Sequence, residues 1–310
     1  MTADPLFYCG VAETVWNRSP VSPGSHTCVS PVYGRTIEGR HETRVRLPSD
    51  TLCIQDSGAF SDGPGRRLDP RTALERQQAH SLKYGYETQV THRASYDFLI
   101  DESWTDGNRF KRRWSVIDAE EAVDATIEAA EFMAEYSDLP AILSAQGVDA
   151  DQYFRCTRRV APFLRKGDVF GLGGFCVTGK MPAQMMPVFQ DTFWKVIPWI
   201  ATQGVKRVHI FGVIYAHALG QLLWLCDQHD IALSTDSIGP NLNPIRGEWG
   251  YANWRDPGYV RPPVERLGAD RARHVALTRE WIRNLRQTRY YRQPHRSYAK
   301  QLFFLSDATP

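Results

Sequence analysis

Acidic and amide side chains stand at the ends of several short apolar segments of this 310-residue chain. Asp56, Asp101, Gln146 and Asp236 each follow an apolar run that is typical of a buried strand. If these strands are parallel, their carboxyl ends lie on one face, where barrel enzymes place their active sites. Carboxylates there can act as nucleophiles or as general acids and bases. The sequence therefore predicts that these four side chains surround one small-molecule pocket.

The segments that must position these side chains alternate between strands and helices. Strands are predicted at 5–10 and around 168–174, and in apolar runs that end at residues 56, 101, 146, 212 and 236, with 301–305 as the candidate eighth strand. Helices are predicted at 69–84, 118–136, 150–164, 183–203, 216–229 and 269–290. This alternation predicts an α/β fold with a parallel sheet. We expect a TIM (β/α)8-like barrel with irregular insertions, of which residues 16–50 are one, and a doubly wound open sheet is the alternative.

A predicted boundary near residue 240 separates the barrel, 1–240, from a basic, aromatic-rich segment, 241–310, that packs on it. The segment carries 13 Lys/Arg against 6 Asp/Glu, whereas residues 1–240 carry 24 against 29. Such an excess of positive charge favours a polyanionic partner. Contact with a nucleic-acid backbone is predicted for four arginines of its helix, namely Arg279, Arg283, Arg286 and Arg289. An ordinary arginine-bearing surface helix is the alternative.

Composition is that of a water-soluble globular enzyme, with 42% hydrophobic and 23% charged residues. No apolar run reaches the about 20 residues that cross a bilayer, and no secretory signal is expected. The six cysteines are scattered without a CxxC pair, which favours buried, reduced thiols in a cytoplasmic protein. The first strand is not followed by GxGxxG, and no Walker A motif occurs, so neither a Rossmann nor a P-loop site is expected. We expect no metal and no cofactor.

Taken in order, six of these strand ends resemble motifs of the tRNA-guanine transglycosylase superfamily. The match covers about residues 50–240, and the matching segments are Asp56–Phe60 (DSGGF in the family), Ile100–Ser103 (FDEC), Gln146–Gly147 (QG), Gly173–Val177 (GGLAV), Phe211–Val213 (MGVG) and Thr235–Ser237, which bears the family's nucleophilic aspartate. Each motif alone is weak, but six in order are fairly specific. The resemblance implies a TIM barrel that exchanges guanine for a 7-deazaguanine in nucleic acid.

The resemblance also implies a role for each site residue. Asp236 is implied to attack C1′ of a target guanosine, and Asp56 is implied to transfer protons. Asp101 would accept hydrogen bonds from N1–H and the amine of the base, while Gln146 and the backbone of Gly174 would serve its O6. The remaining implied base contacts are Ser57 and Gly173, which position the base, and Phe60 and Phe211, which stack on its faces.

A short chain without the family's zinc site and with a basic C-terminus most resembles the family's DNA-directed (DpdA) branch, found in bacteria and phages. No cysteine follows Cys226, so the family's C-terminal zinc site of three Cys and one His is missing. Thr178-Gly179-Lys180 stands where the family has a glutamate, and Ser103 replaces the FDEC cysteine. The implied partners are DNA, with tRNA as the alternative, and a free 7-deazaguanine base such as preQ0. A homodimer is compatible with these features, and no membrane partner is expected.

Two other classes of function remain open on the same residues. A nucleosidase or glycosidase would use two carboxylates and water on the same barrel. A catalytically silent nucleic-acid-binding protein would have no need of three such acids. Exchange of labelled guanine without net release of base separates these classes from a transglycosylase.

Overall fold

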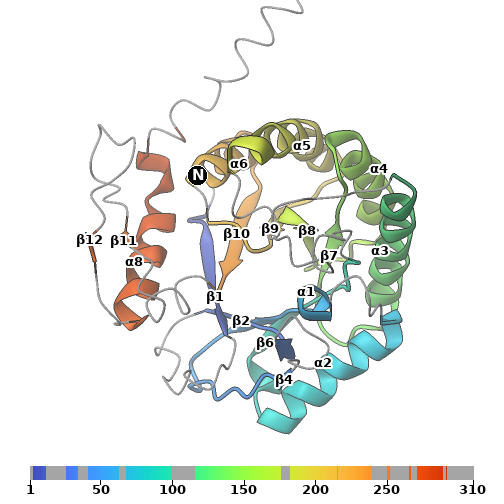
Figure 1. Ribbon diagram of the computed structural model, residues 1–310, viewed down its shortest axis with the longest axis vertical. Helices are drawn as coiled ribbons and strands as arrows, with labels where there is room; N and C mark the ends of the chain where they lie inside the picture. Colours follow the sequence, from blue (N-terminus) through green and yellow to red (C-terminus); the bar gives the residue numbers. More distant parts are fainter. Residues whose placement is uncertain are drawn as a thin grey trace, which may run out of the picture.

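Eight parallel strands close into a barrel (Figure 1). The computed structural model describes residues 3–11, 26–33, 41–62, 68–98, 116–175, 182–214, 216–238, 250–251, 265–266, 271–288 and 291. The barrel strands, in order around the ring, are β1 (Leu6–Val11), β2 (Thr27–Val29), β5 (Cys53–Gln55), β6 (Val90–Ala94), β7 (Ala141–Ala145), β8 (Val169–Leu172), β9 (Arg207–Ile210) and β10 (Ala232–Ser237). Because β10 pairs with β1, the sheet is closed, which confirms the TIM-like barrel and excludes the open doubly wound sheet.

Helices surround the barrel, as Figure 1 shows. They are α1 (Ala59–Asp62), α2 (Pro70–Tyr84), α3 (Val116–Tyr136), α4 (Ala150–Val160), α5 (Pro182–Thr202), α6 (Ala216–Gln228) and α8 (Arg271–Arg283), with short 3-10 turns η1 (Glu87–Gln89), η3 (Ala161–Phe163) and η5 (Leu285–Gln287). Two hairpin-like pairs lie apart from the barrel sheet, β3 (Val32–Tyr33) with β4 (His41–Glu42) and β11 (Gly250–Tyr251) with β12 (Glu265–Arg266). Helix α8 packs against β1 and so covers the strand at which the ring closes.

Local sequence explains where the helices begin and end. Asp69 caps α2 by accepting from the backbone N–H of Thr72 at 3.0 Å, and Pro70 occupies the first turn. Gly85 ends the helix in the left-handed conformation, with φ of 68°. The predicted helices at 69–84, 118–136, 183–203 and 216–229 are confirmed to within about two residues.

Two strand predictions are wrong. The third predicted strand, ending at Asp101, lies earlier, because β6 ends at Ala94. Residues 95–98 follow that strand, and Asp101 lies outside the described residues. The eighth barrel position belongs to β2, inside the stretch predicted to be a loop, while residues 301–305 lie outside the described residues. Three residues are too few to show a strand period, so the sequence carries no signal for β2.

Alternation along the strands divides the core into two layers. The inward layer contains one residue from each of seven strands or strand ends: Tyr8, Cys28, Ile54, Ala94, Ile142, Val169 and Phe211. Their neighbours on the same strands, such as Phe7, Leu143 and Phe170, join the larger layer between strands and helices. Polar residues at inward positions near the C-terminal ends therefore face into the barrel mouth.

Candidate functional site

Three aspartates from different strand ends lie close enough to influence one another's protonation. Asp56 follows β5, Asp97 lies three residues after β6, and Asp236 is the second-last residue of β10. Burial raises the pKa of Asp56, and the negative charge of Asp236 raises it further. Burial likewise raises the pKa of Asp97 to about 7, with contributions from Asp56 and then Asp236. Like charges that share a site suit a division of labour between an ionised and a protonated carboxyl group.

Asp236 is held through one of its two oxygens. Its Oδ1 accepts from the backbone N–H of Gly212 at 3.0 Å and lies 3.1 Å from Nε2 of His209. Within the described part of the chain, no N–H or O–H group donates to Oδ2. The thiol of Cys28 also hydrogen-bonds to this carboxyl group, and its pKa is raised by burial and then by the charge of Asp236. Two N–H donors thus hold Oδ1, and the other polar contact is a thiol, which is a weak donor.

Asp56 is positioned by the turn that ends β5. Its Oδ2 accepts from the backbone N–H of Gly58 at 3.2 Å, and its carboxyl group also bonds to the Ser30 hydroxyl. Gly58 has φ of 83°, and a Cβ there would lie 2.6 Å from the guanidinium of Arg76, so the turn requires glycine. The Ser57 hydroxyl accepts from the N–H of Ala59 at 3.3 Å and is buried. Ser57 and Asp56 therefore lie on one rigid turn.

Asp97 is an acid without a side-chain partner among the described residues. Its Oδ2 packs against the end of β8, since a Cβ on Gly173 would lie 2.6 Å away. The backbone on both sides is held firmly: the N–H of Ser95 donates to Ile142 O at 2.9 Å, and that of Phe98 donates to Thr126 Oγ1 at 3.1 Å. A half-buried carboxyl group with a raised pKa at a strand end of a barrel is typical of functional sites.

Gln146 lies beside this segment and is fully buried. Its Nε2 donates to the carbonyl of Phe98 and, at 2.7 Å, to Thr126 Oγ1. Its amide nitrogen is therefore occupied by the protein and supports the loop that carries Asp97. The role predicted for Gln146 in binding a base stays a prediction.

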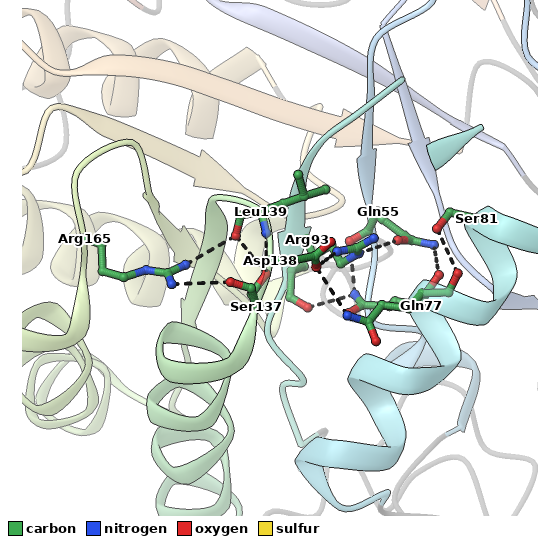
Figure 2. A network of polar contacts seen from close by, with 10 residues as sticks. Gln55, Gln77, Ser81, Arg93, Ser137, Asp138, Leu139 and Arg165 are labelled. Atoms are coloured by element: carbon green, nitrogen blue, oxygen red, sulfur yellow. Dashed lines mark hydrogen bonds and ion pairs between the residues drawn. The ribbon is translucent and has the colours of Figure 1, made fainter. Parts of the chain in front are cut away.

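A buried polar network fixes the ends of β5 and β6 (Figure 2). Gln77 of α2 donates through Nε2 to the carbonyls of Asp56 at 3.1 Å and Ala94 at 3.0 Å. Arg93 of β6 donates through Nε to Gln55 Oε1 at 3.1 Å and pairs with Asp138. The network joins one helix to two adjacent strands, immediately before the segments that carry the acids.

A second brace joins α1, α2 and the segment after β6. Asp62 is buried and binds both guanidinium nitrogens of Arg76, at 3.1 and 2.9 Å. The Tyr96 hydroxyl donates to the same carboxylate at 2.9 Å, and Arg76 also donates to the carbonyl of Ser57. The brace thus holds Ser57, next to Asp56, and Tyr96, next to Asp97, in fixed relation.

The other predicted base contacts lie around the same mouth. Gly173 follows β8, and Gly174 has φ of 78° and packs against the hydroxyl of Tyr153. Phe211 is buried in the inward layer with its ring 4.5 Å from that of His209. Phe60 is half-buried on α1. The described predicted residues therefore come from the C-terminal ends of β5, β7, β8, β9 and β10, as expected.

The predicted nucleic-acid arginines are placed differently. Arg286 pairs with Asp227 through two 2.8 Å contacts and with Asp4 at 3.2 Å, at the N-terminal end of β1. It is therefore occupied by protein groups on the face opposite the three aspartates. Arg283 is exposed, Arg279 is half-buried, and Arg289 lies outside the described residues. Burial lowers the pKa of His26, and the positive charges of Arg279 and Arg283 lower it further.

Two functional candidates are absent from the sequence prediction. Asp97 lies three residues after the end of β6. Ending the third predicted strand earlier in the sequence would have identified it. His209 stands two residues before Phe211 and so shares its inward side of β9, which the period of a strand indicates.

Two kinds of feature are absent from the described residues. No three His, Cys, Asp or Glu side chains there are grouped as metal ligands would be. No helix in the same ranges is long and apolar enough to cross a membrane.

Comparison with known proteins concerns the fold. No protein-family model matches the chain, and no curated protein matches its sequence. Among solved structures, a proposed fructose-1,6-biphosphate aldolase from Coccidioides immitis is 9% identical, with 93% of this chain and 89% of that chain covered and a TM-score of 0.38. A proposed sugar phosphate isomerase/epimerase from Anabaena variabilis ATCC 29413 is 12% identical, with 77% and 76% covered and a TM-score of 0.37. The strand pairing of this chain itself identifies it as an α/β protein with a closed, eight-stranded, TIM-like barrel.

Proposed function

We propose that this barrel is a base-exchange transglycosylase that replaces guanine in DNA by a free 7-deazaguanine. One observation carries the proposal: three aspartates meet at the barrel mouth, one anchored through a single oxygen and two with a raised pKa. The resemblance of the DSGAF, QG, GGFCV and TDS segments to transglycosylase motifs supplies the reaction class. The same geometry would serve a tRNA substrate, so an experiment must decide whether the substrate is DNA or tRNA.

In the proposed reaction, the open Oδ2 of Asp236 attacks C1′ of the target nucleoside. The C1′–N9 bond breaks, its electron pair leaves with guanine, and Asp56 gives a proton to the departing base. The incoming base then loses its N9 proton to Asp56 and attacks C1′, which frees the Asp236 carboxylate. The raised pKa of Asp56 suits a group that both gives and takes a proton near neutral pH.

Asp97 is assigned the contact with the base edge that the motif resemblance implies for Asp101. An ionised carboxylate can accept from both N1–H and the exocyclic amine of a guanine-like ring. Asp97 has a rigid backbone, no side-chain partner among the described residues, and a glycine that leaves room beside it. Phe211 and Phe60 supply aromatic surface for stacking, worth roughly 1–3 kcal/mol per base.

The decisive assay is incorporation of labelled guanine into DNA and, in parallel, into tRNA. We expect Asp236→Ala to abolish incorporation, by at least about 10³-fold, because the covalent route is lost. Asp151→Ala, which changes an exposed acid on α4, is the matched control and should keep the wild-type rate.

Each alternative has its own outcome in this assay. Release of free base without incorporation would replace the proposal by a nucleosidase. Binding of DNA with neither release nor incorporation would replace it by a binding protein. Incorporation that persists in Asp236→Ala would overturn the nucleophile assignment.

A further inference from the structure

His209 occupies the inside of the barrel directly beneath Asp236. Its side chain is completely buried, and both ring nitrogens face polar atoms of the adjacent strand β10. Nε2 lies 3.1 Å from Asp236 Oδ1, and Nδ1 lies 2.9 Å from Ser234 Oγ. Because Ser234 and Asp236 are two residues apart, they point to the same side of β10 and hold the ring between them.

The contacts of His209 distinguish the two oxygens of Asp236. The imidazole and the backbone N–H of Gly212 both converge on Oδ1. Oδ2 accepts from no N–H or O–H group within the described ranges. When a carboxylate attacks carbon through one oxygen, hydrogen bonds that fix its second oxygen also orient the attacking lone pair, which favours the reaction. In the ester that forms, Oδ1 becomes the carbonyl oxygen and can keep both donors.

Asp236 sets which ring nitrogen carries the proton, and Ser234 contacts the other ring nitrogen. Asp236 in its carboxylate form can only accept, so Nε2 must carry a hydrogen for this contact to be a hydrogen bond. A neutral ring then needs a donor at Nδ1, and the Ser234 hydroxyl is 2.9 Å away. The same hydroxyl lies 3.3 Å from Val208 O, its alternative acceptor. Orientation of an imidazole through its second nitrogen is a recurrent way to fix a tautomer.

We propose that His209 is a positioning residue for Asp236: oriented by Ser234, it holds Oδ1 and leaves Oδ2 as the attacking oxygen. This inference rests on the proposed function for its kinetic consequence. The hydrogen-bonded unit itself, Ser234–His209–Asp236, is independent of which substrate the barrel takes.

The kinetic test separates kcat from KM in the labelled-base assay. His209→Leu removes the donor, and we expect kcat to fall about 10²–10³-fold, which is the usual cost of losing one positioned donor at a reacting oxygen. The KM for the free base should change less than about threefold, because His209 does not face the base. His209→Gln, which can still donate, should recover part of kcat, and Ser234→Ala should give a smaller loss. An unchanged kcat in His209→Leu, or an equal loss in the Leu and Gln variants, would overturn the proposal.

A second readout does not depend on turnover. In ¹⁵N-histidine-labelled protein, NMR should show His209 as the Nε2–H tautomer at pH 7, and both Ser234→Ala and Asp236→Asn should move its ring resonances. A ring that is protonated only at Nδ1, or that ignores both substitutions, would overturn the proposal even if His209→Leu fails to fold. If wild-type protein shows this coupling but no base exchange, the proposed function fails while the hydrogen-bonded unit stands.

Discussion

At the scale of single residues, the barrel mouth is defined by acids whose protonation is set by their surroundings. Asp97 has no side-chain partner among the described residues, and its pKa is raised to about 7. Asp236 accepts from His209 and from the backbone N–H of Gly212 through Oδ1. The two acids therefore differ in their hydrogen-bond partners, and residue type alone does not reveal this difference. A site of this kind is expected to reduce stability, because the protein keeps a carboxyl group where its ionisation is unfavourable.

Asp97→Asn should stabilise the protein at alkaline pH. Asp97 has a pKa of about 7 when folded and about 3.8 when unfolded, so between these values the folded state holds the extra proton. The free energy of unfolding therefore falls as pH rises from about 4 to 7, by up to roughly 4 kcal/mol at 1.36 kcal/mol per unit. Asparagine removes this loss, so denaturant unfolding at pH 8 should show a gain of about 1–4 kcal/mol and little change at pH 4.

The control for this prediction is Asp124→Asn, an exposed acid on α3 that pairs with Arg159. It should leave the pH dependence of unfolding nearly unchanged, since exposed pairs contribute about 0–1 kcal/mol. A wild-type profile that is flat between pH 4 and 7 would contradict the assignment of a raised pKa to Asp97.

At the scale of elements, two polar braces connect α2 to the strand ends that carry the acids. One runs from Gln77 to the carbonyls of Asp56 and Ala94, and the other joins Asp62, Arg76 and Tyr96. Both braces support the barrel mouth from the side of α2. The sequence predicted α2 correctly, but nothing local indicates that Arg76, fourteen residues after Asp62, binds its carboxylate.

Asp62→Ala should destabilise the protein by about 3 kcal/mol, because it leaves the guanidinium of Arg76 unpaired in a mostly buried position. Tyr96→Phe should cost about 1 kcal/mol, the usual value of one hydrogen bond. Urea denaturation measures both. If Asp62→Ala costs no more than an exposed ion pair, such as Lys206 with Asp230, the brace is not a stabilising element.

Two arginines that the sequence analysis treated alike have different surroundings: Arg283 ends α8, and Arg286 lies in η5. Arg286→Glu should lower the melting temperature, because it replaces the pairing with Asp227 and Asp4 by repulsion. Arg283→Glu should leave stability nearly unchanged, because Arg283 is exposed. If α8 contacts the nucleic-acid backbone, the latter variant should also flatten the salt dependence of DNA binding by about two phosphate contacts. An unchanged salt slope would remove Arg283 from the interface.

At the scale of the whole molecule, closure of the sheet brings residues 56, 97 and 236 together. The last barrel strand along the chain, β10, pairs with the first, β1. Arg286 joins η5, α6 and the residues before β1 on the opposite face. Closure of the barrel therefore forms the mouth. The contacts of Arg286 lie on the face away from it.

Closure also protects the thiols, which gives a test of global stability. Five cysteines are buried, and burial raises the pKa of Cys9, Cys53 and Cys156 to about 12 in each case. In a Cys176→Ser background, which removes the cysteine outside the described residues, a thiol reagent should react only as fast as the barrel opens. All five should react together in denaturant, and rapid reaction of one thiol in native buffer would show local opening at its strand.

Sequence alone determined six of the eight barrel strands, the extent of α2 and the places of Asp56 and Asp236 at strand ends, because these follow from local periodicity and turn chemistry. It placed the end of β6 too late, at Asp101, which lies outside the described residues, and it indicated neither Asp97 nor β2. Only the tertiary structure decided which acids meet, which oxygen of Asp236 is held, and that His209 holds it. Those properties depend on burial and on charges far apart in the chain, which a linear pattern does not contain.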